Sequence, residues 1–325
     1  MGPVSHTPRA TAHSSVLILG YGAFGHAIHA ALTGRDDVVV SVYSRSRRTA
    51  DHPLVEMFHS LPAVDVSHYD IVVVALPGHA VFDVLSGCAR PAPGTAFLSC
   101  VKGMDPLSGR FPSDVISDAT GSDYMAVMSG ASFAHEMLLG LPVFLTLACT
   151  NALLGRDLVE RLESEVLQLE LSDDVRGLEI AGVGKNIIAL GAGLSDGLQL
   201  GDNFRAAFVA RGIGELQRVA ERLGGRAETI VAAGALADFI LSCSSPRSRN
   251  YEHGWNLARR TDSAQSLSEG RHSAESFVRM LKGQHVQSAY FESIAAALTD
   301  PPLISESLSR TGGLASRRTS ETRRK

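Results

Sequence analysis

The sequence predicts an α/β protein whose first half forms a doubly wound β-sheet domain and whose second half is all helical. Short apolar runs bounded by turn residues recur between residues 15 and 149, with helical stretches between some of them. This alternation is typical of a doubly wound sheet. From about Asp173 the strand pattern disappears and helical patterns continue to about residue 309. A chain of 325 residues is also too long for one ordinary core, so two domains are expected.

The expected boundaries follow from these patterns. Residues 1–14 lack an apolar signal core and are expected to be disordered. The sheet domain is expected over 15–174 and the helical domain over 175–309. Residues 310–325 end in several arginines and a lysine, which predicts a basic, disordered tail.

Composition places the chain among globular proteins. Hydrophobic residues make up 45% and charged residues 20%, and the net charge of −4 gives no reason to expect a nucleic-acid partner. The sequence holds no run of about eighteen apolar residues free of charges, so no membrane span is predicted. The four cysteines form no CxxC pair. Cysteines spaced in this way fit a protein of the reducing cytoplasm and predict neither a zinc site nor a disulfide framework.

The first predicted strand leads directly into a glycine-rich loop. Ser15–Leu19 is a short apolar run, and Gly20-Tyr-Gly-Ala-Phe-Gly25 and a helical pattern over 26–32 follow it at once. A G-x-G-x-x-G loop between a strand and a helix is the dinucleotide-binding pattern of Rossmann-type domains. Gly20 allows the tight turn, Gly22 lets the backbone approach a pyrophosphate, and Gly25 lets the helix pack on the strand. The pyrophosphate is expected at the positive end of that helix.

The second predicted strand, 38–43, indicates which dinucleotide is bound. An acidic residue at its end selects NAD by accepting a hydrogen bond from the ribose 2′-hydroxyl. Here the chain reads Tyr43-Ser-Arg-Ser-Arg-Arg48, without an acid and with three arginines, of which Arg45 is the first. Because guanidinium groups suit a phosphate, NADP(H) is favoured and NAD(H) stays possible. The alternative is a solvated basic loop.

Polar residues follow two later strands of the predicted sheet. Further strands are predicted over 70–77, 95–101, 124–128 and 143–149, with a helix over 80–89. Lys102-Gly103 follows one of these strands, and Ser129-Gly-Ala-Ser-Phe-Ala134 follows another. Ligands of doubly wound sheets bind at the carboxyl ends of strands, so both segments are candidate sites.

The helix predicted over 176–200 is apolar nearly all round and is therefore expected in a core. Lys185 is its single lysine, and no carboxylate stands one turn away from it. Its neighbours one turn away are Ala181, Gly182, Ile188 and Ala189. Asp196 shares its face but lies about 16 Å away at about 1.5 Å per residue. The lysine must reach water, meet a partner from elsewhere in the chain, or be desolvated for chemistry.

A second helix is predicted over 203–223, and a polar cluster comes later, at Ser242–Asn250, after Asp238 in an apolar segment. Hydroxyls and arginines at a helix start can bind a phosphate, although an ordinary capped loop is the commoner fate of such a cluster. Metal-ligand spacing is absent from the sequence. His135-Glu136 lacks the second histidine of H-E-x-x-H.

Together these segments resemble the NAD(P)-dependent glycerol-3-phosphate dehydrogenases of the bacterial type, from about residue 15 to about 309. The matching motifs are Gly20-Tyr-Gly-Ala-Phe-Gly25, Val101-Lys-Gly103, Ser129-Gly-Ala-Ser-Phe-Ala134, Gly177-Leu-Glu-Ile-Ala-Gly-Val-Gly-Lys-Asn186, Gly201-Asp-Asn203, Arg211-Gly212, Asp238, Ser245-Pro-Arg-Ser-Arg-Asn250 and Ser268-Glu-Gly270. The order and spacing of these motifs match the family.

The resemblance implies roles for individual residues. Lys185 is expected as the proton donor and acceptor, with Lys102 and Asp238 as the other catalytic residues and as its partners. The residues expected at the substrate are Lys102, Gly130, Ser132, Lys185, Asp238, Ser248, Arg249 and Asn250. Together with the glycine loop and Arg45 identified above, the resemblance gives a full set of residues expected at the dinucleotide. They are Gly20, Gly22, Ala23, Phe24, Gly25, Arg45, Lys102, Ala134, Arg249 and Glu269.

Departures from the family pattern leave the substrate open. Ala131 stands where the family usually has proline, Val101 where it commonly has threonine, and Ala235-Leu-Ala-Asp238 replaces Gly-Leu-Gly-Asp. The stretch before Asp70 is short and lacks the family's usual Asn-containing loop. Because the catalytic residues are kept, a reductase of dihydroxyacetone phosphate is expected. The alternatives are a related phosphorylated ketone in a specialised biosynthetic pathway, or a non-catalytic NADP(H)-binding sensor. The resemblance also implies a homodimer.

Overall fold

The computed structural model describes residues 13–33, 35–45, 56–58, 64–261 and 269–305. Strand β1 (Ser14–Leu19) begins one residue before the predicted start, because the Ser14 N–H donates to the Asp37 carbonyl at 2.7 Å. Ser14 is therefore ordered, against the prediction of disorder over 1–14. Residues 1–12 and the predicted tail 310–325 lie outside the described residues.

The first half is an eight-stranded sheet in the order β3-β2-β1-β4-β5-β6-β7-β8. Its other strands are β2 (Val38–Tyr43), β3 (Glu56–Phe58), β4 (Ile71–Val74), β5 (Ala96–Ser99), β6 (Met125–Ala131), β7 (Val143–Ala148) and β8 (Leu167–Ser172). Every neighbouring pair is parallel except β6 and β7, which are antiparallel. The predicted doubly wound domain is confirmed, and β3 and β8 are additional strands.

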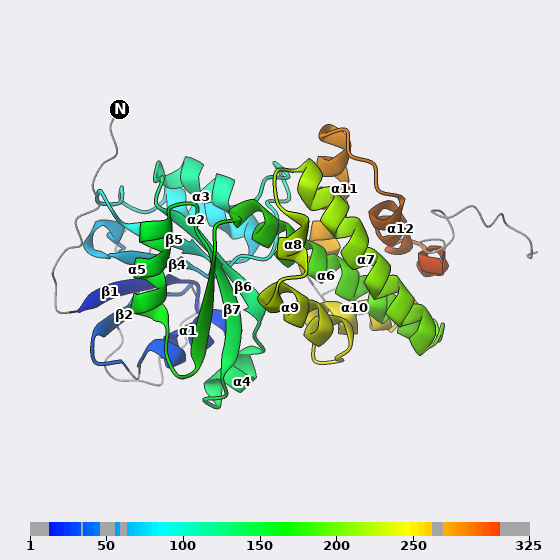
Figure 1. Ribbon diagram of the computed structural model, residues 1–325, viewed down its shortest axis with the longest axis horizontal. Helices are drawn as coiled ribbons and strands as arrows, with labels where there is room; N and C mark the ends of the chain where they lie inside the picture. The colour runs from blue at the N-terminus through cyan, green and yellow to red at the C-terminus, as the bar shows by residue number, and fades with distance from the viewer. Residues whose placement is uncertain (1–12, 34, 46–55, 59–63, 262–268, 306–325) are drawn as a thin grey trace, which may run out of the picture.

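Helices cover both faces of the sheet (Figure 1). One face packs against α1 (Ala23–Thr33), α4 (Ala134–Leu138) and α5 (Ala152–Leu162). The other face packs against α2 (Val81–Ser86) and α3 (Pro112–Thr120). Short 3-10 turns at Val66–His68 and Gly78–Ala80 precede β4 and α2. Because both faces are covered, the central strands are buried at every residue, which is why they read as unbroken apolar runs.

The second half is helical, as predicted. It contains α6 (Val175–Gly197), α7 (Asp202–Arg222), α8 (Ala227–Ile230), α9 (Ala233–Cys243), α10 (Arg249–Arg259), α11 (Glu269–Gly283), α12 (Ala289–Ala297) and a 3-10 turn at Pro301–Ser305. The central helix is α6, which packs against α7, α9, α10 and α11 (Figure 1). The predicted core helix is therefore confirmed.

Two features make α6 a stable central helix. Asp174 caps its first turn by accepting a hydrogen bond from the Gly177 N–H at 2.9 Å. Its glycines, which weaken an isolated helix, give neighbouring side chains and backbone close approach. Leu216 packs on Gly184, and Phe208 packs on Gly191. By length and composition α6 could cross a membrane, but its most apolar stretch is wholly buried inside the protein.

The two halves meet at β6 and β7, where α9 packs against both strands and α6 packs against β6 (Figure 1). Strands β1, β4, β5 and β6 run parallel, so their carboxyl ends share one edge of the sheet. The glycine loop after β1, the Lys102 loop after β5 and the turn after β6 all lie at this edge. The topology thereby brings three predicted segments to one edge of the sheet.

Candidate active site

A buried ionic cluster joins the two halves of the protein. Lys102 follows β5, Lys185 lies in the middle of α6, and Asp238 lies on α9. The Lys102 Nζ donates to Asp238 Oδ2 at 2.8 Å, and the Lys185 Nζ lies 3.4 Å from Asp238 Oδ1. Only 10% of the Lys185 side chain and 6% of the Asp238 side chain are exposed. Lys185 thus meets a partner from elsewhere in the chain.

The charges of this cluster decide the state of its carboxyl group. Burial alone raises the pKa of Asp238, but the positive charges of Lys102 and Lys185 outweigh it, with hydrogen bonds from Lys102 and Ser242. The pKa of Asp238 therefore lies below its ordinary value, and the carboxyl is ionised at neutral pH. Two ammonium groups share one carboxylate, so the cluster is net positive. Such a site favours an oxygen that carries or develops negative charge.

The end of β6 supplies the wall next to Lys102. The Gly130 carbonyl accepts hydrogen bonds from Lys102 Nζ at 3.0 Å and from Ser132 Oγ at 3.3 Å. Gly130 has φ +153°, and a Cβ there would lie 3.0 Å from both the Phe144 carbonyl oxygen and the Leu145 Cα. Glycine is therefore needed where the Lys102 acceptor is presented.

An asparagine pair extends the cluster towards α10. Asn186 donates through Nδ2 to the Lys102 carbonyl at 3.2 Å, and its Oδ1 accepts from Asn250 Nδ2 at 2.8 Å. The Asn250 Oδ1 in turn accepts from the Gly270 N–H at 2.8 Å. These bonds link the Lys102 loop, α6, α10 and α11. Sequence reasoning named Asn250 but gave Asn186 no role. The signal that could have identified Asn186 is a polar side chain inside an apolar helix, as for Lys185.

The start of α10 holds the remaining predicted substrate residues. Ser248 is buried and caps the helix by accepting from the Tyr251 N–H at 3.5 Å. Arg249 is exposed, and within the described part of the chain its guanidinium has no carboxylate within ion-pair distance. A helix start with an available guanidinium and a buried amide beside it is suited to an anion.

The predicted cofactor residues of the first half lie along the carboxyl edge of the sheet, whereas Arg249 and Glu269 begin α10 and α11. The loop Gly20–Gly25 follows β1, Arg45 is exposed just past β2, and Ala134 begins α4. Glu269 begins α11, but its side chain lies outside the described residues. The order β2-β1-β4-β5-β6 spreads these positions across several strands. The structure therefore gathers Lys102, Lys185, Asp238, Gly130 and Ser132 at one place and sets Arg45 apart from them.

The glycine loop fits a pyrophosphate. Gly20 has φ +102°, and a Cβ at Gly25 would collide with the Gly20 carbonyl, so both glycines are needed for the fold. By contrast, Gly22 is exposed and a Cβ there would meet nothing within 4 Å. Gly22 thus leaves open space at the amino end of α1, which carries positive partial charge. Among the described residues, no three His, Cys, Asp or Glu side chains converge as they would at a metal site.

Comparisons with known proteins find matches over both halves of the chain. Residues 60–154 match the family model for the N-terminus of NAD-dependent glycerol-3-phosphate dehydrogenase, and residues 174–306 match the model for its C-terminus. A glycerol-3-phosphate dehydrogenase (NAD(P)+) of Bradyrhizobium sp. is 33% identical over 89% of this chain and 93% of its own length. The corresponding protein of Paracoccus denitrificans is 34% identical over 82% of this chain and 87% of its own.

Solved structures share the fold. The crystal structure of glycerol-3-phosphate dehydrogenase from Coxiella burnetii has a TM-score of 0.82 at 25% identity, covering 92% of this chain and all of that one (100%). The glycerol-3-phosphate dehydrogenase of Plasmodium falciparum has a TM-score of 0.78 at 17% identity, covering 94% and 97% of the two chains. The likeness extends over both halves of the chain.

Proposed function

Because this chain belongs to the NAD-dependent glycerol-3-phosphate dehydrogenase family, we propose that it interconverts dihydroxyacetone phosphate and sn-glycerol 3-phosphate with NADP(H) as the preferred cofactor. Membership makes it an oxidoreductase that acts on a CH–OH group and depends on NAD(P). The single observation that best supports the substrate chemistry is the buried Lys102–Asp238–Lys185 cluster at the carboxyl edge of the sheet. A cytoplasmic homodimer is part of the same proposal.

The cluster suits reduction of a ketone. A bound nicotinamide dinucleotide supplies the hydride. Lys185 then donates a proton to the oxygen at C2, and in the reverse direction it accepts that proton. Lys102 stabilises the negative charge that develops on the same oxygen. Asp238 holds both ammonium groups in place through its two oxygens, at 2.8 Å and 3.4 Å.

The phosphate of the substrate would lie at the start of α10. Ser248 and Asn250 are buried there, and Arg249 offers a guanidinium. Binding energy from a remote phosphate positions the ketone against Lys185 and contributes to the rate. The asparagine pair Asn250–Asn186 ties this phosphate region to the backbone of Lys102.

A substrate panel tests the proposal. Purified protein is incubated with NADPH or NADH and with dihydroxyacetone phosphate or other phosphorylated ketones, and the absorbance of the reduced nicotinamide is followed. We expect the fastest turnover with NADPH and dihydroxyacetone phosphate. Faster turnover of another ketone would favour the related-substrate alternative, which Ala131 and the changed segment Ala235–Asp238 motivate. Cofactor binding without turnover of any ketone would identify a sensor.

Arg45 tests the cofactor preference. It is exposed just after β2, where the 2′-phosphate of a bound NADPH would be expected. Arg45→Ala should weaken NADPH by about 10- to 100-fold, the value of a charge-assisted hydrogen bond, and leave NADH nearly unchanged. Dissociation constants for both nicotinamides measure this, with the exposed Arg222→Ala on α7 as control. Equal losses for both nicotinamides would show that Arg45 makes no contact with that phosphate.

Gly22 separates a cofactor role from a structural one. A Cβ at Gly22 has no neighbour within 4 Å and the residue has no positive φ, so Gly22→Ala should leave the unfolding midpoint unchanged. It should still weaken both nicotinamides, because the added methyl group takes space needed by the pyrophosphate. Gly214→Ala on α7, which is equally open, serves as control. Undiminished affinity in Gly22→Ala would place the pyrophosphate elsewhere.

A further inference from the structure

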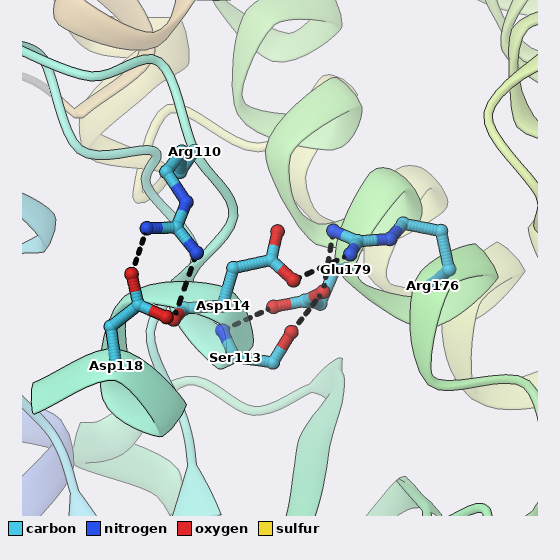
Figure 2. A network of polar contacts seen from close by, with 6 residues as sticks. All are labelled: Arg110, Ser113, Asp114, Asp118, Arg176 and Glu179. Atoms are coloured by element: carbon cyan, nitrogen blue, oxygen red, sulfur yellow. Dashed lines mark hydrogen bonds and ion pairs between the residues drawn. The ribbon is translucent and has the colours of Figure 1, made fainter. Parts of the chain in front are cut away.

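Glu179 is a buried carboxyl group that the proposed chemistry does not use. It lies on α6 and reaches the amino end of α3, where Oε1 accepts from the Ser113 N–H and Oε2 from the Ser113 Oγ, both at 2.8 Å (Figure 2). Phe111, the N-cap residue of α3, gives no side-chain hydrogen bond, and Pro112 has no N–H to offer. A carboxylate from the other half of the protein therefore caps α3.

The same face of α6 contacts the Lys102 loop at two other points. Positions 182 and 186 lie three and seven residues after position 179, so the three positions lie along one face of the helix. Asn186 holds the Lys102 carbonyl at 3.2 Å. A Cβ at Gly182 would lie 3.8 Å from Lys102 Cγ, so the stem of the lysine runs alongside this position of α6. Glu179 and Asn186 thus attach to α6 the two ends of the segment 102–113, which carries Lys102 and leads into α3.

We propose that Glu179 is a positioning residue: by fixing Ser113, it holds the segment 102–113 against α6 and sets Lys102 and Lys185 around Asp238. This inference rests on the proposed function, because it assigns Glu179 to the same reaction. It does not place Glu179 in contact with substrate. Its role depends on a side chain long enough to carry the carboxylate from α6 to the amino end of α3.

The groups around Glu179 offset the effect of its burial only in part. Burial raises its pKa to about 7, against the opposing effects of Arg176 and Ser113. The Arg176 guanidinium lies 3.2 Å from Glu179 Oε2 and 2.8 Å from Asp114 Oδ1 (Figure 2). It also stacks over the Phe111 ring. Arg110 pairs with Asp118 on the exposed side of α3 and forms no ion pair with α6 among the described residues.

Two variants separate reach from charge. Glu179→Asp keeps the charge and can keep the Arg176 pair, but it withdraws the carboxylate from Ser113. Glu179→Gln keeps the reach and the acceptor for the Ser113 N–H, but it loses the charge. If Glu179 acts by position, kcat with dihydroxyacetone phosphate should fall about 10- to 100-fold in Glu179→Asp, as small misplacements of catalytic groups do. Glu179→Gln should keep most of the wild-type kcat.

The affinity for NADPH should change much less than kcat in both variants, because the Gly20–Gly25 loop follows β1 and Lys102 alone of the residues expected at the dinucleotide lies in the segment 102–113. Asp118→Asn, also on α3 but exposed and paired only with Arg110 among the described residues, is the matched control and should keep wild-type kcat. A lowered unfolding midpoint with wild-type kcat in both Glu179 variants would reduce Glu179 to a structural residue. Loss in Glu179→Gln with retention in Glu179→Asp would assign the effect to charge. Either result overturns the inference, whereas absence of turnover in the wild type would instead refute the proposed function.

The pH dependence of stability provides a second readout. Because the pKa of Glu179 is raised to about 7 in the folded protein, and an unfolded glutamate titrates near about 4.3, the folded state binds the proton more tightly. Its ionisation therefore costs stability as pH rises through this window. Glu179→Gln should lose this dependence, so its unfolding midpoint relative to wild type should increase from pH 5 to pH 8. If the difference between the two unfolding midpoints stayed constant from pH 5 to pH 8, the Glu179 carboxyl would not be buried.

Discussion

Replacing Lys185 with methionine should lower kcat by about 10³-fold or more, since a positioned general acid contributes about 10² to 10⁴ and stabilisation of the developing charge is lost with it. Methionine has a similar length and no charge, so the buried space on α6 stays filled. Asp238 keeps Lys102 at 2.8 Å, and the carboxylate is not left unpaired. The protein should therefore fold and bind NADPH as the wild type does.

Single-turnover measurements with NADPH and dihydroxyacetone phosphate check this, because they report the chemical step and not product release. Lys282→Met, an exposed lysine on α11, controls for loss of a positive charge. If Lys185→Met raised KM and kept kcat, Lys185 would contribute to binding alone. A rate equal to the wild type would remove it from the reaction.

Replacing Asp238 with asparagine should affect both folding and activity. The carboxylate is buried between Lys102 and Lys185, and its removal leaves two ammonium groups in a low-dielectric site with only an amide between them. Breaking a buried ion pair costs about 3–5 kcal/mol, so the free energy of unfolding should fall by that order at pH 7. The rate should fall as well, because the carboxylate no longer orients either lysine.

Denaturant unfolding at several pH values measures this loss. The pKa of Asp238 is lowered in the folded protein, so its contribution to stability is present above the unfolded pKa of about 3.9. That contribution disappears as pH falls through the folded value. The difference between wild type and Asp238→Asn should therefore be constant near neutrality and shrink in acid. Asp202→Asn, 87% exposed and paired with Arg205, should change stability little. A similarly small change in Asp238→Asn would show that the cluster is hydrated.

The fold class could be predicted from the sequence because its signals are local. The run Ser15–Leu19 and the loop Gly20–Gly25 are contiguous. Gly20 is required by its φ and by the chain just after β4, and Gly25 by the carbonyl of Gly20. Strand β8 also had a local signal, since Leu167-Gln-Leu-Glu-Leu-Ser172 alternates apolar and polar residues. The antiparallel pairing of β6 with β7 had none. Whether two neighbouring strands run parallel or antiparallel depends on the path of the chain that connects them, here through α4.

The site could be predicted only in part. Lys185 was identifiable because a charge in an apolar helix requires a partner, and Lys102 and Asp238 became its candidates through the family motifs. Glu179 carries a similar sequence signal, a carboxyl group in that apolar helix, but its contact with α3 runs through the N–H and hydroxyl of Ser113, 66 positions away, and no local pattern reveals it.

The sequence by itself determined the chemical types: a glycine loop before a helix, an arginine where an acid would select NAD, and a lone lysine on a core helix. Only the tertiary structure decided which groups meet. Lys102 and Asp238 are 136 positions apart in the chain, and they come together because α6 and α9 dock on β6. A buried charge is stabilised by groups within a few ångströms in space, and local sequence patterns do not encode that proximity.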